Sequence, residues 1–290
     1  MKRSNAIAAL GAMAALVAGG VAVSGCGASA TLDPIARAAE VSSQQTGVTI
    51  AMSMQFSSPA LPGGSYAITA NGSFDERAHT GQMTMDLSGV PGLSSLPGGG
   101  DGQVRIVMVY PDIYMNMPFL AGKLPEGKTW MKLDIGKAAA AAGVDSSSLS
   151  SLDQSDPTQF LEYLRGSSGG VVSFGSETIE GVPTTHYHGT LELSRVLSKL
   201  PGSEQAAAKA ALEKLGTGDA FPVEVWIDAQ GRVRRMEMSL GGAGATAGLS
   251  ATITIDFKSY GAVPPVVPPP AGEVFDATST AISGIGAGAG

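Results

Sequence analysis

Apolar and polar residues alternate along most of the chain after position 47, which is the pattern of β-strands that bury one face. In the first such segment, residues 48–56, Val, Ile, Met and Phe occupy every second position, and Thr, Ala, Ser and Gln lie between them. Turns rich in Gly, Pro and Asp separate the strand-like segments. We predict strands over residues 48–56, 66–70, 83–87, 104–110, 113–117, 131–135, 172–174, 185–191, 221–227, 233–240 and 253–257, with the first six forming an antiparallel meander.

Helical patterns frame and interrupt these strands. Asp33-Pro34 places an N-cap before a proline at the first helical position, and predicts a short amphipathic helix that ends near Gly47. Further helices are expected at 156–165 and 203–215. A sheet with one polar face needs a cover on its apolar face, and these two helices are the natural covers. The sequence therefore predicts an α+β fold, in which helices cover the concave face of a curved antiparallel half-barrel sheet of about 10–11 strands.

The C-terminal end of the chain lacks the strand pattern. Residues 264–270 are rich in proline and cannot join the centre of a sheet. The tail from 278 to 290 has low complexity, and we expect it to be disordered. We therefore assign residues 33–262 to one folded domain and residues 263–290 to a Pro-rich segment and tail.

The N-terminus has the features of an export signal. Lys2 and Arg3 precede an apolar stretch over residues 6–23, after which comes Cys26, the only cysteine in the chain. The stretch is nearly long enough to span a bilayer, so an uncleaved membrane anchor is the alternative. Its alanines and glycines are only weakly apolar, which favours transient engagement by the export machinery.

Residues 23–26 (VSGC) resemble the bacterial lipobox. The resemblance implies transfer of diacylglycerol to the thiol of Cys26, cleavage after Gly25, and acylation of the new amino terminus. Residues 1–25 would then be a cleaved signal peptide, and residues 26–32 a lipidated tether. Two acyl chains anchor a protein stably, so we expect it on the outer face of the plasma membrane, within the cell envelope. No other cofactor is expected.

Composition and charge exclude some partners. Removal of Lys2 and Arg3 lowers the formal charge from −7 to −9, and the chain has no basic run, so nucleic acid is not an expected partner. A single cysteine also excludes disulfides within the chain.

Methionines mark one face of the predicted sheet. Ten of the twelve lie beyond Cys26, and eight of these form pairs two residues apart, so each pair shares a strand face. Methionine adapts to varied apolar shapes, which suits a lipid-binding surface, although the same residues also serve as gap-fillers in a closed core. The candidate cavity lining is Val48, Ile50, Met52, Met54, Met83, Met85, Met115, Met117, Leu133, Phe160, Leu164, Met236 and Met238.

Motifs for catalysis or metal binding are weak. Residues 166–170 (GSSGG) match the G-x-S-x-G pattern, but here a helix precedes the serine and a strand follows it, which is the reverse of a nucleophile elbow. We expect no enzyme activity. His186 and His188 point the same way from one strand, but His79 is the only other histidine, so polar surface positions are favoured over a metal site. The basic residues Arg232, Arg234, Arg235 and Lys258 fit either an anionic head group or a solvated turn.

Several segments resemble actinobacterial lipoproteins of the LppX/LprG type, which have a LolA-like fold. They are residues 128–134 (KTWMKLD), Asp156-Pro157 with its helix, 181–187 (GVPTTHY), 225–228 (VWID) and 231–235 (GRVRR). The resemblance covers most of residues 33–262 and rests on turns and packing positions. It implies a half-barrel whose concave face and helices enclose an apolar cavity for acyl chains, such as a palmitate-length chain.

Two functions remain open from sequence. The first is a cell-surface lipoprotein that binds or carries a lipid or other amphiphile without catalysis. The second is an envelope interaction or sensory lipoprotein that has the same fold, a filled core, a protein partner and no lipid cargo. In both, the membrane is reached through the lipid anchor at Cys26.

Overall fold

The computed structural model describes residues 34–61, 63–93, 102–120, 122–141, 171–192, 219–241 and 250–287, with a few single positions between these ranges. Residues Leu32–Gly290 form one compact unit, and all the described helices and strands belong to it. Gly25, Cys26, Phe160, Leu164 and the helices expected at 156–165 and 203–215 lie outside the described residues.

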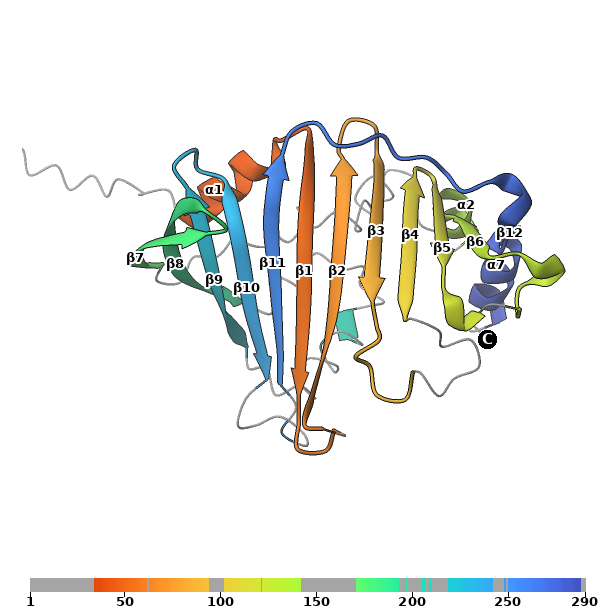
Figure 1. The fold of residues 1–290 in the computed structure, drawn as a ribbon, viewed down its shortest axis with the longest axis horizontal. Coiled ribbons are helices and arrows are strands. Elements are labelled where there is room, and N and C mark those ends of the chain that lie inside the picture. The colour runs from red at the N-terminus through yellow and green to blue at the C-terminus, as the bar shows by residue number, and fades with distance from the viewer. Residues whose placement is uncertain are drawn as a thin grey trace, which may run out of the picture. The chain divides into compact units, whose positions relative to one another are not determined.

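One twelve-stranded, strongly twisted and curved open sheet dominates this unit (Figure 1). The sheet confirms the predicted α+β architecture and contains one strand more than expected. Its order is β12-β6-β5-β4-β3-β2-β1-β11-β10-β9-β8-β7. The strands are β1 (Gly47–Ser57), β2 (Ser65–Asp75), β3 (Thr80–Asp86), β4 (Gln103–Val109), β5 (Asp112–Asn116), β6 (Trp130–Asp134), β7 (Val172–Ile179), β8 (Val182–Glu192), β9 (Ala220–Asp228), β10 (Val233–Gly241), β11 (Ser250–Tyr260) and β12 (Val274–Asp276).

The first six strands form the predicted meander, because each pairs antiparallel with the next. Strands β7 to β11 form a second antiparallel run, and β11 pairs with β1 to join the two. The chain therefore returns to its starting strand after building both halves, which places β1 near the middle of the sheet.

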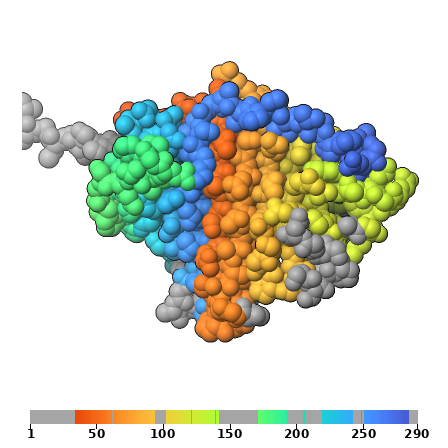
Figure 2. All heavy atoms as spheres, in the orientation of Figure 1, coloured from red at the N-terminus to blue at the C-terminus, as the bar shows by residue number. Residues whose placement is uncertain are grey.

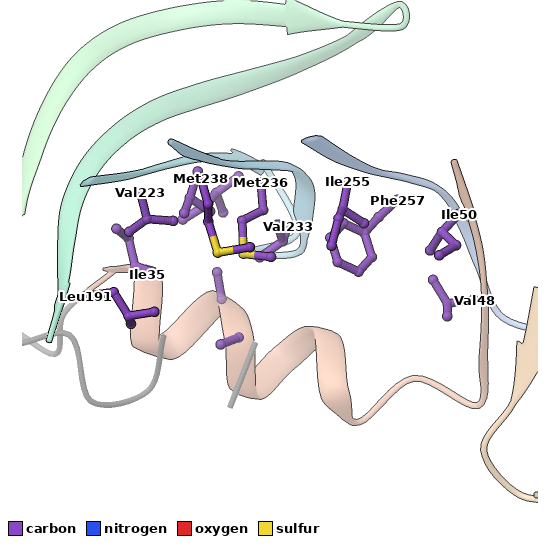
Figure 3. Close-up of a cluster of buried hydrophobic side chains, with 14 of the residues drawn as sticks. Ile35, Val48, Ile50, Leu191, Val223, Val233, Met236, Met238, Ile255 and Phe257 are labelled. Atoms are coloured by element: carbon purple, nitrogen blue, oxygen red, sulfur yellow. The ribbon is translucent and has the colours of Figure 1, made fainter. Parts of the chain in front are cut away.

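Helix α1 (Pro34–Ser43) covers part of the apolar face (Figure 3). Ile35, Ala38 and Ala39 are fully buried in one cluster with side chains from β1, β2 and β8 to β11. The hydroxyl of Ser42 also accepts a hydrogen bond of 2.9 Å from the backbone N–H of Val233. The predicted first helix is thus confirmed, and it is the cover of this part of the sheet. Its partners in the cluster are Val48, Ile50, Phe74, Leu191, Phe221, Val223, Val225, Ile227, Val233, Met236, Met238, Ile255 and Phe257.

The expected disorder after residue 277 is wrong for most of the tail, and the folded domain extends past residue 262. Helix α7 (Thr278–Ala287) packs against β6 and against α2 (Ile135–Ala141). Its own residues favour helix only weakly, but β12 pairs parallel with β6 immediately before it and fixes its position. Ile135 begins α2 rather than ending a strand. Three short 3-10 helices complete the described elements: η2 (Pro118–Leu120), η3 (Pro125–Gly127) and η5 (Ala271–Glu273).

Candidate ligand-binding face

Strand register brings the methionines onto one face of the sheet, here called the methionine face. Met52 lies opposite Ala70 on β2 and Ile255 on β11. Met115 lies opposite Ile106 on β4 and Met131 on β6. Because directly opposed residues in an antiparallel sheet point to the same side, these pairings extend one apolar surface across the strands from β6 to β9.

The half of this face under α1 is closed by the protein's own side chains. Val48, Ile50, Met236 and Met238 were predicted to line a cavity, and the structure places all four in the packed cluster with α1 (Figure 3). Val48, Ile50 and Met236 are no more than 1% exposed. These four side chains therefore form core, and the cavity prediction for them does not fit their packing.

The other half, here called the open half, runs from the C-terminal part of β1 to β6. Its Met, Ile and Leu side chains are only partly buried, whereas Ala70 and Val104 are buried. Met52, Met83 and Met108 touch the edge of the packed cluster. No charged residue occupies the inward positions of β1 to β6 in the described part of the chain. From the predicted lining it contains Met52, Met54, Met83, Met85, Met115 and Leu133, with Met117 immediately after β5; Ile106, Met108, Ile113 and Met131 join them.

Sequence reasoning missed Met108 and Met131 because neither belongs to a pair spaced two residues apart. The register of β3 to β6 identifies them, since Met108 lies opposite Ile113 and Met131 opposite Met115. Seven of the thirteen predicted residues therefore belong to the open half, and two further methionines extend it.

A glycine shapes the boundary between the two halves. A Cβ atom on Gly81 would lie 2.6 Å from Cδ1 of Phe74 and 2.8 Å from Cε of Met108. Glycine at this position therefore allows the Phe74 ring and the Met108 thioether to lie flat over β3. Since Phe74 is buried in the packed cluster and Met108 is half-buried, these two side chains mark the point where the open half begins.

The opposite face is polar and carries the two histidines considered for metal binding. His186 Nε2 lies 2.8 Å from Glu224 Oε2, and His188 Nδ1 lies 2.7 Å from Glu224 Oε1, so one carboxylate bridges both rings. The His186 ring also stacks on Trp226 at 4.3 Å between centroids. In the described ranges, no group of three or more His, Cys, Asp or Glu side chains has the arrangement of a metal site.

The basic residues near the β9–β10 turn are engaged by carboxylates. Arg232 and Arg234 both contact Oδ2 of Asp228, at 2.9 and 2.8 Å. Arg235 pairs with Asp256, and Lys258 with Glu180. This arrangement does not fit a free cationic patch for an anionic head group, because each cation already has an anionic neighbour.

Cavities are present in other parts of the unit. One of about 550 Å³ lies on the polar face between β1 and β6, beneath Pro264. Another of about 340 Å³ lies beside α1, between Val41, Tyr187 and the β9–β10 turn. No helix in the part of the chain that the structure describes is long and apolar enough to cross a membrane.

Comparisons with known proteins identify relatives at low identity. No family model matches the chain. An uncharacterized 31.2 kDa protein of Streptomyces griseus, from the region between rplA and rplJ, is 28% identical over 206 residues; the match covers 68% of this chain and 64% of the relative, just under two thirds of its length.

Three solved structures are also similar to most of the chain at low sequence identity. Lipoprotein LppX of Mycobacterium tuberculosis has a TM-score of 0.47 at 17% identity, over 81% of this chain and 97% of its own. LprF of Mycobacterium bovis has a TM-score of 0.45 at 12% identity, over 82% and 96%. A LolA superfamily protein of Nitrosomonas europaea has a TM-score of 0.26 at 10% identity, over 80% and 93%. Each of these proteins is similar to the chain at less than 20% identity. The strand pairing itself gives the large, mostly antiparallel sheet that was predicted.

Proposed function

We propose that this protein is an envelope lipoprotein that binds the acyl chain of a lipid or other amphiphile on the open half of the methionine face, without catalysing a reaction. The observation that carries the proposal is the width of this surface. Apolar side chains from six neighbouring strands share it, no charged residue interrupts it in the described strands, and its methionines remain only partly buried.

Energetics support acyl chains as the ligand. Each methylene that leaves water contributes about 0.8 kcal/mol, so a sixteen-carbon chain gains on the order of 12 kcal/mol. A bilayer offers nearly the same gain. A carrier therefore needs a broad, adaptable apolar surface of similar quality, and flexible thioether side chains provide one.

The proposal also fits an anchored location. Lipidation at Cys26 would hold the domain at the outer face of the membrane, where it would meet lipid cargo directly. Covalent diacylglycerol and an N-acyl chain at Cys26 remain predictions, as does the protein partner to which cargo would be delivered.

Organic extraction and mass spectrometry of the protein from Leu32 onward test the proposal. We expect about one lipid per protein after purification, and saturable binding of BODIPY-labelled hexadecanoate by delipidated protein. Protein that carries no lipid and ignores the probe would contradict lipid binding.

Substitutions on the open half locate the site. Met115→Asp places a charge between Ile106 and Met131, and we expect it to weaken probe binding at least about tenfold, because a buried carboxylate without a partner is costly. Met115→Leu keeps the surface apolar and should change binding less than about twofold.

Met85→Gln provides a second, uncharged test in case Met115→Asp does not fold, as judged by circular dichroism. Glutamine has nearly the length of methionine and adds an amide to the surface. Weaker probe binding with an unchanged melting curve supports the site; equal binding by all folded variants places the lipid elsewhere.

The second candidate is an interaction lipoprotein, and the edge strand β7 favours it. β7 is the last strand of the sheet, and almost all of its residues are exposed. Phe174 on this strand is 65% exposed and Val172 is 52% exposed. Exposed apolar groups on an edge strand suit pairing with a partner's strand. Loss of partner capture after Phe174→Lys, in protein that contains no lipid, would support this candidate.

A further inference from the structure

The cavity on the polar face, here called the polar groove, lies on the side of the sheet opposite the methionine face. Figure 2 shows the sheet from this side, with the chain after β11 crossing its upper rim. The groove has a volume of about 550 Å³, which is within the range of small-molecule clefts. Residues of five strands, β1 to β4 and β6, and Pro264 of the crossing segment form its walls, so distant parts of the sequence build it together.

Side chains with both donor and acceptor groups line the groove. They are the hydroxyls of Thr49, Ser73 and Thr84 and the amides of Asn71 and Gln82. Within the described residues, the only hydrogen bond between these side chains joins Gln82 Nε2 to Ser73 Oγ at 3.4 Å. Asn71, Gln82 and Thr84 are exposed to solvent, so their polar groups are available to a ligand.

One cation stands at the end of the groove. The guanidinium of Arg105 lies over the Trp130 ring, 5.6 Å from its centroid, and Nη2 is 3.4 Å from Oδ1 of Asn116. The contacts with the Trp130 ring and with Asn116 hold the guanidinium beside the groove, and its remaining N–H groups can donate to a ligand. Arg105 is exposed, whereas Trp130 is largely buried beneath it.

This chemistry excludes several ligand classes. No carboxylate lines the groove among the described residues, so a metal ion or a basic peptide has no counter-charge there. A single arginine is too little charge for a nucleic acid or another polyanion. The ligand that matches is neutral or weakly charged and has its own donor and acceptor groups along its length.

We infer that the polar groove binds a saccharide, either as part of a polysaccharide or as the head group of a glycolipid. Hydroxyl groups of sugar rings both donate and accept hydrogen bonds, as the Thr, Ser, Asn and Gln side chains of the groove do. Val107, Pro264 and the rim of Trp130 supply apolar surface for the C–H faces of the rings. The position of the groove across several strands suits a chain of a few rings rather than one.

The saccharide site is independent of the proposed lipid site. Side chains alternate between the two faces along each strand, so Thr84 points to the polar face, and Met83 and Met85 point to the methionine face. Met83 and Ile106 also border the floor of the groove, whereas Met85 and Met115 do not. Arg105 likewise neighbours Ile106. Loss of one binding activity therefore leaves the other to be measured.

Titration with soluble hexasaccharides tests the inference. Trp130 and Trp226 are the two tryptophans of the chain, so Trp226→Phe in the protein from Leu32 onward leaves Trp130 as a reporter in the wall of the groove. We expect cellohexaose, maltohexaose, mannohexaose or chitohexaose to change its fluorescence saturably in the micromolar to millimolar range. Calorimetry on the protein with both tryptophans checks that the reporter substitution does not create the binding.

Matched variants test whether binding depends on the groove residues or only on the positive charge of the protein. Arg105→Ala should weaken binding at least about tenfold, and Asn71→Ala with Thr84→Ala by a similar factor without a charge change. Arg77→Ala removes one exposed arginine from the β2–β3 turn, outside the groove, and should change affinity less than about twofold.

A second arm distinguishes the two sources of saccharide. Phosphatidylcholine vesicles with and without a galactosyl lipid are compared for binding of the same variants. Binding to soluble hexasaccharides identifies a polysaccharide ligand, and binding only to the galactosyl vesicles identifies a glycolipid head group. Both results support the groove if Arg105→Ala reduces them; no binding in either arm, or binding equal in Arg105→Ala and the unchanged protein, overturns the inference.

Discussion

At the residue scale, a buried carboxylate organises the β9–β10 turn. The side chain of Asp228 is 1% exposed and receives N–H groups from Arg232, Arg234 and the backbone of Gln230. Burial by itself raises the pKa of Asp228, but the hydrogen bonds from Arg232 and Arg234 outweigh it and hold the pKa below its ordinary value. The three arginines of this region therefore serve structure, and the sequence alone left that role open.

Asp228→Asn should destabilise the protein by about 3 kcal/mol, because two guanidinium groups lose their buried anion. Urea unfolding at pH 7 measures this change. Glu126→Gln is the control, since Glu126 is 81% exposed and pairs only loosely with Lys128, and it should change stability by less than about 0.5 kcal/mol.

The pH dependence of stability in the same variant tests whether it is the ionised form of Asp228 that stabilises the fold. A carboxylate with a lowered pKa contributes stability above its unfolded pKa of about 3.9 and loses that contribution as pH falls through the folded value. The difference between unchanged protein and Asp228→Asn should therefore shrink below about pH 4. A difference that grows on acidification would contradict the ionised role of Asp228.

At the element scale, the C-terminal elements interlock with β6 and α2. The hydroxyl of Thr278 accepts a hydrogen bond of 2.9 Å from the backbone N–H of Asp134, and Asp134 in turn accepts one from the N–H of Lys137 in α2. The N–H of Thr278 donates to Asp276, which also lies 3.0 Å from the Nζ of Lys132. These bonds explain why a sequence of weak helix formers is ordered as α7.

Asp276 is the titratable part of this anchor. The Thr278 hydroxyl, its backbone N–H and the Lys132 ammonium stabilise the carboxylate against the opposing effect of burial and lower the pKa of Asp276 to about 2. Asp276→Asn should therefore increase hydrogen exchange in residues 278–287 a few-fold at pH 7. The effect belongs to the pH range above about 4 and should fade as pH falls toward 2. Equal exchange in both proteins at pH 7 would contradict the anchoring role.

The periodicity of apolar residues predicted most of the helices and strands, but it predicted few of the pairings between strands. Strands β1 to β11 follow from the alternation of apolar residues, and α1 follows from Asp33-Pro34. β12 was missed because three residues are too few to show a period, and its parallel pairing with β6 depends on a partner more than a hundred residues away.

The division of the methionine face could not be predicted for a related reason. Only the pairing of β11 with β1 brings β8 to β10 under α1 and closes that half, whereas β3 to β6 contribute no buried residue to the cluster with α1. Met52 and Met236 therefore look alike in sequence but differ in burial. The polar groove was hidden in the same way, since Asn71, Thr84 and Arg105 read as ordinary solvent-facing positions until register aligned them.

At the scale of the whole folded unit, one sheet presents two surfaces with different chemistry. The methionine face supplies an open apolar half, and the polar face supplies a hydroxyl- and amide-lined groove. Because the strands separate the two surfaces, ligands on them do not compete for space. An amphiphile with a sugar head group could not fill both sites with one molecule unless it passed around the sheet edge.

The two activities should therefore respond to different substitutions. Arg105→Ala is expected to leave BODIPY-hexadecanoate binding within about twofold of the unchanged protein, because its side chain lies on the polar face. Met115→Asp should leave hexasaccharide binding equally unaffected in protein that remains folded. Joint loss of both activities in either variant would show that the two faces are coupled.

Photo-crosslinking is the most direct test of the central claim, that the open half of the methionine face holds an acyl chain. Diazirine-labelled hexadecanoate is bound to the protein from Leu32 onward, irradiated, and mapped by peptide mass spectrometry. We predict label on inward residues of β1 to β6, chiefly Met52, Met85 and Met115, and its loss on competition with unlabelled hexadecanoate. Label confined to the polar face, or no label above background, would contradict the claim.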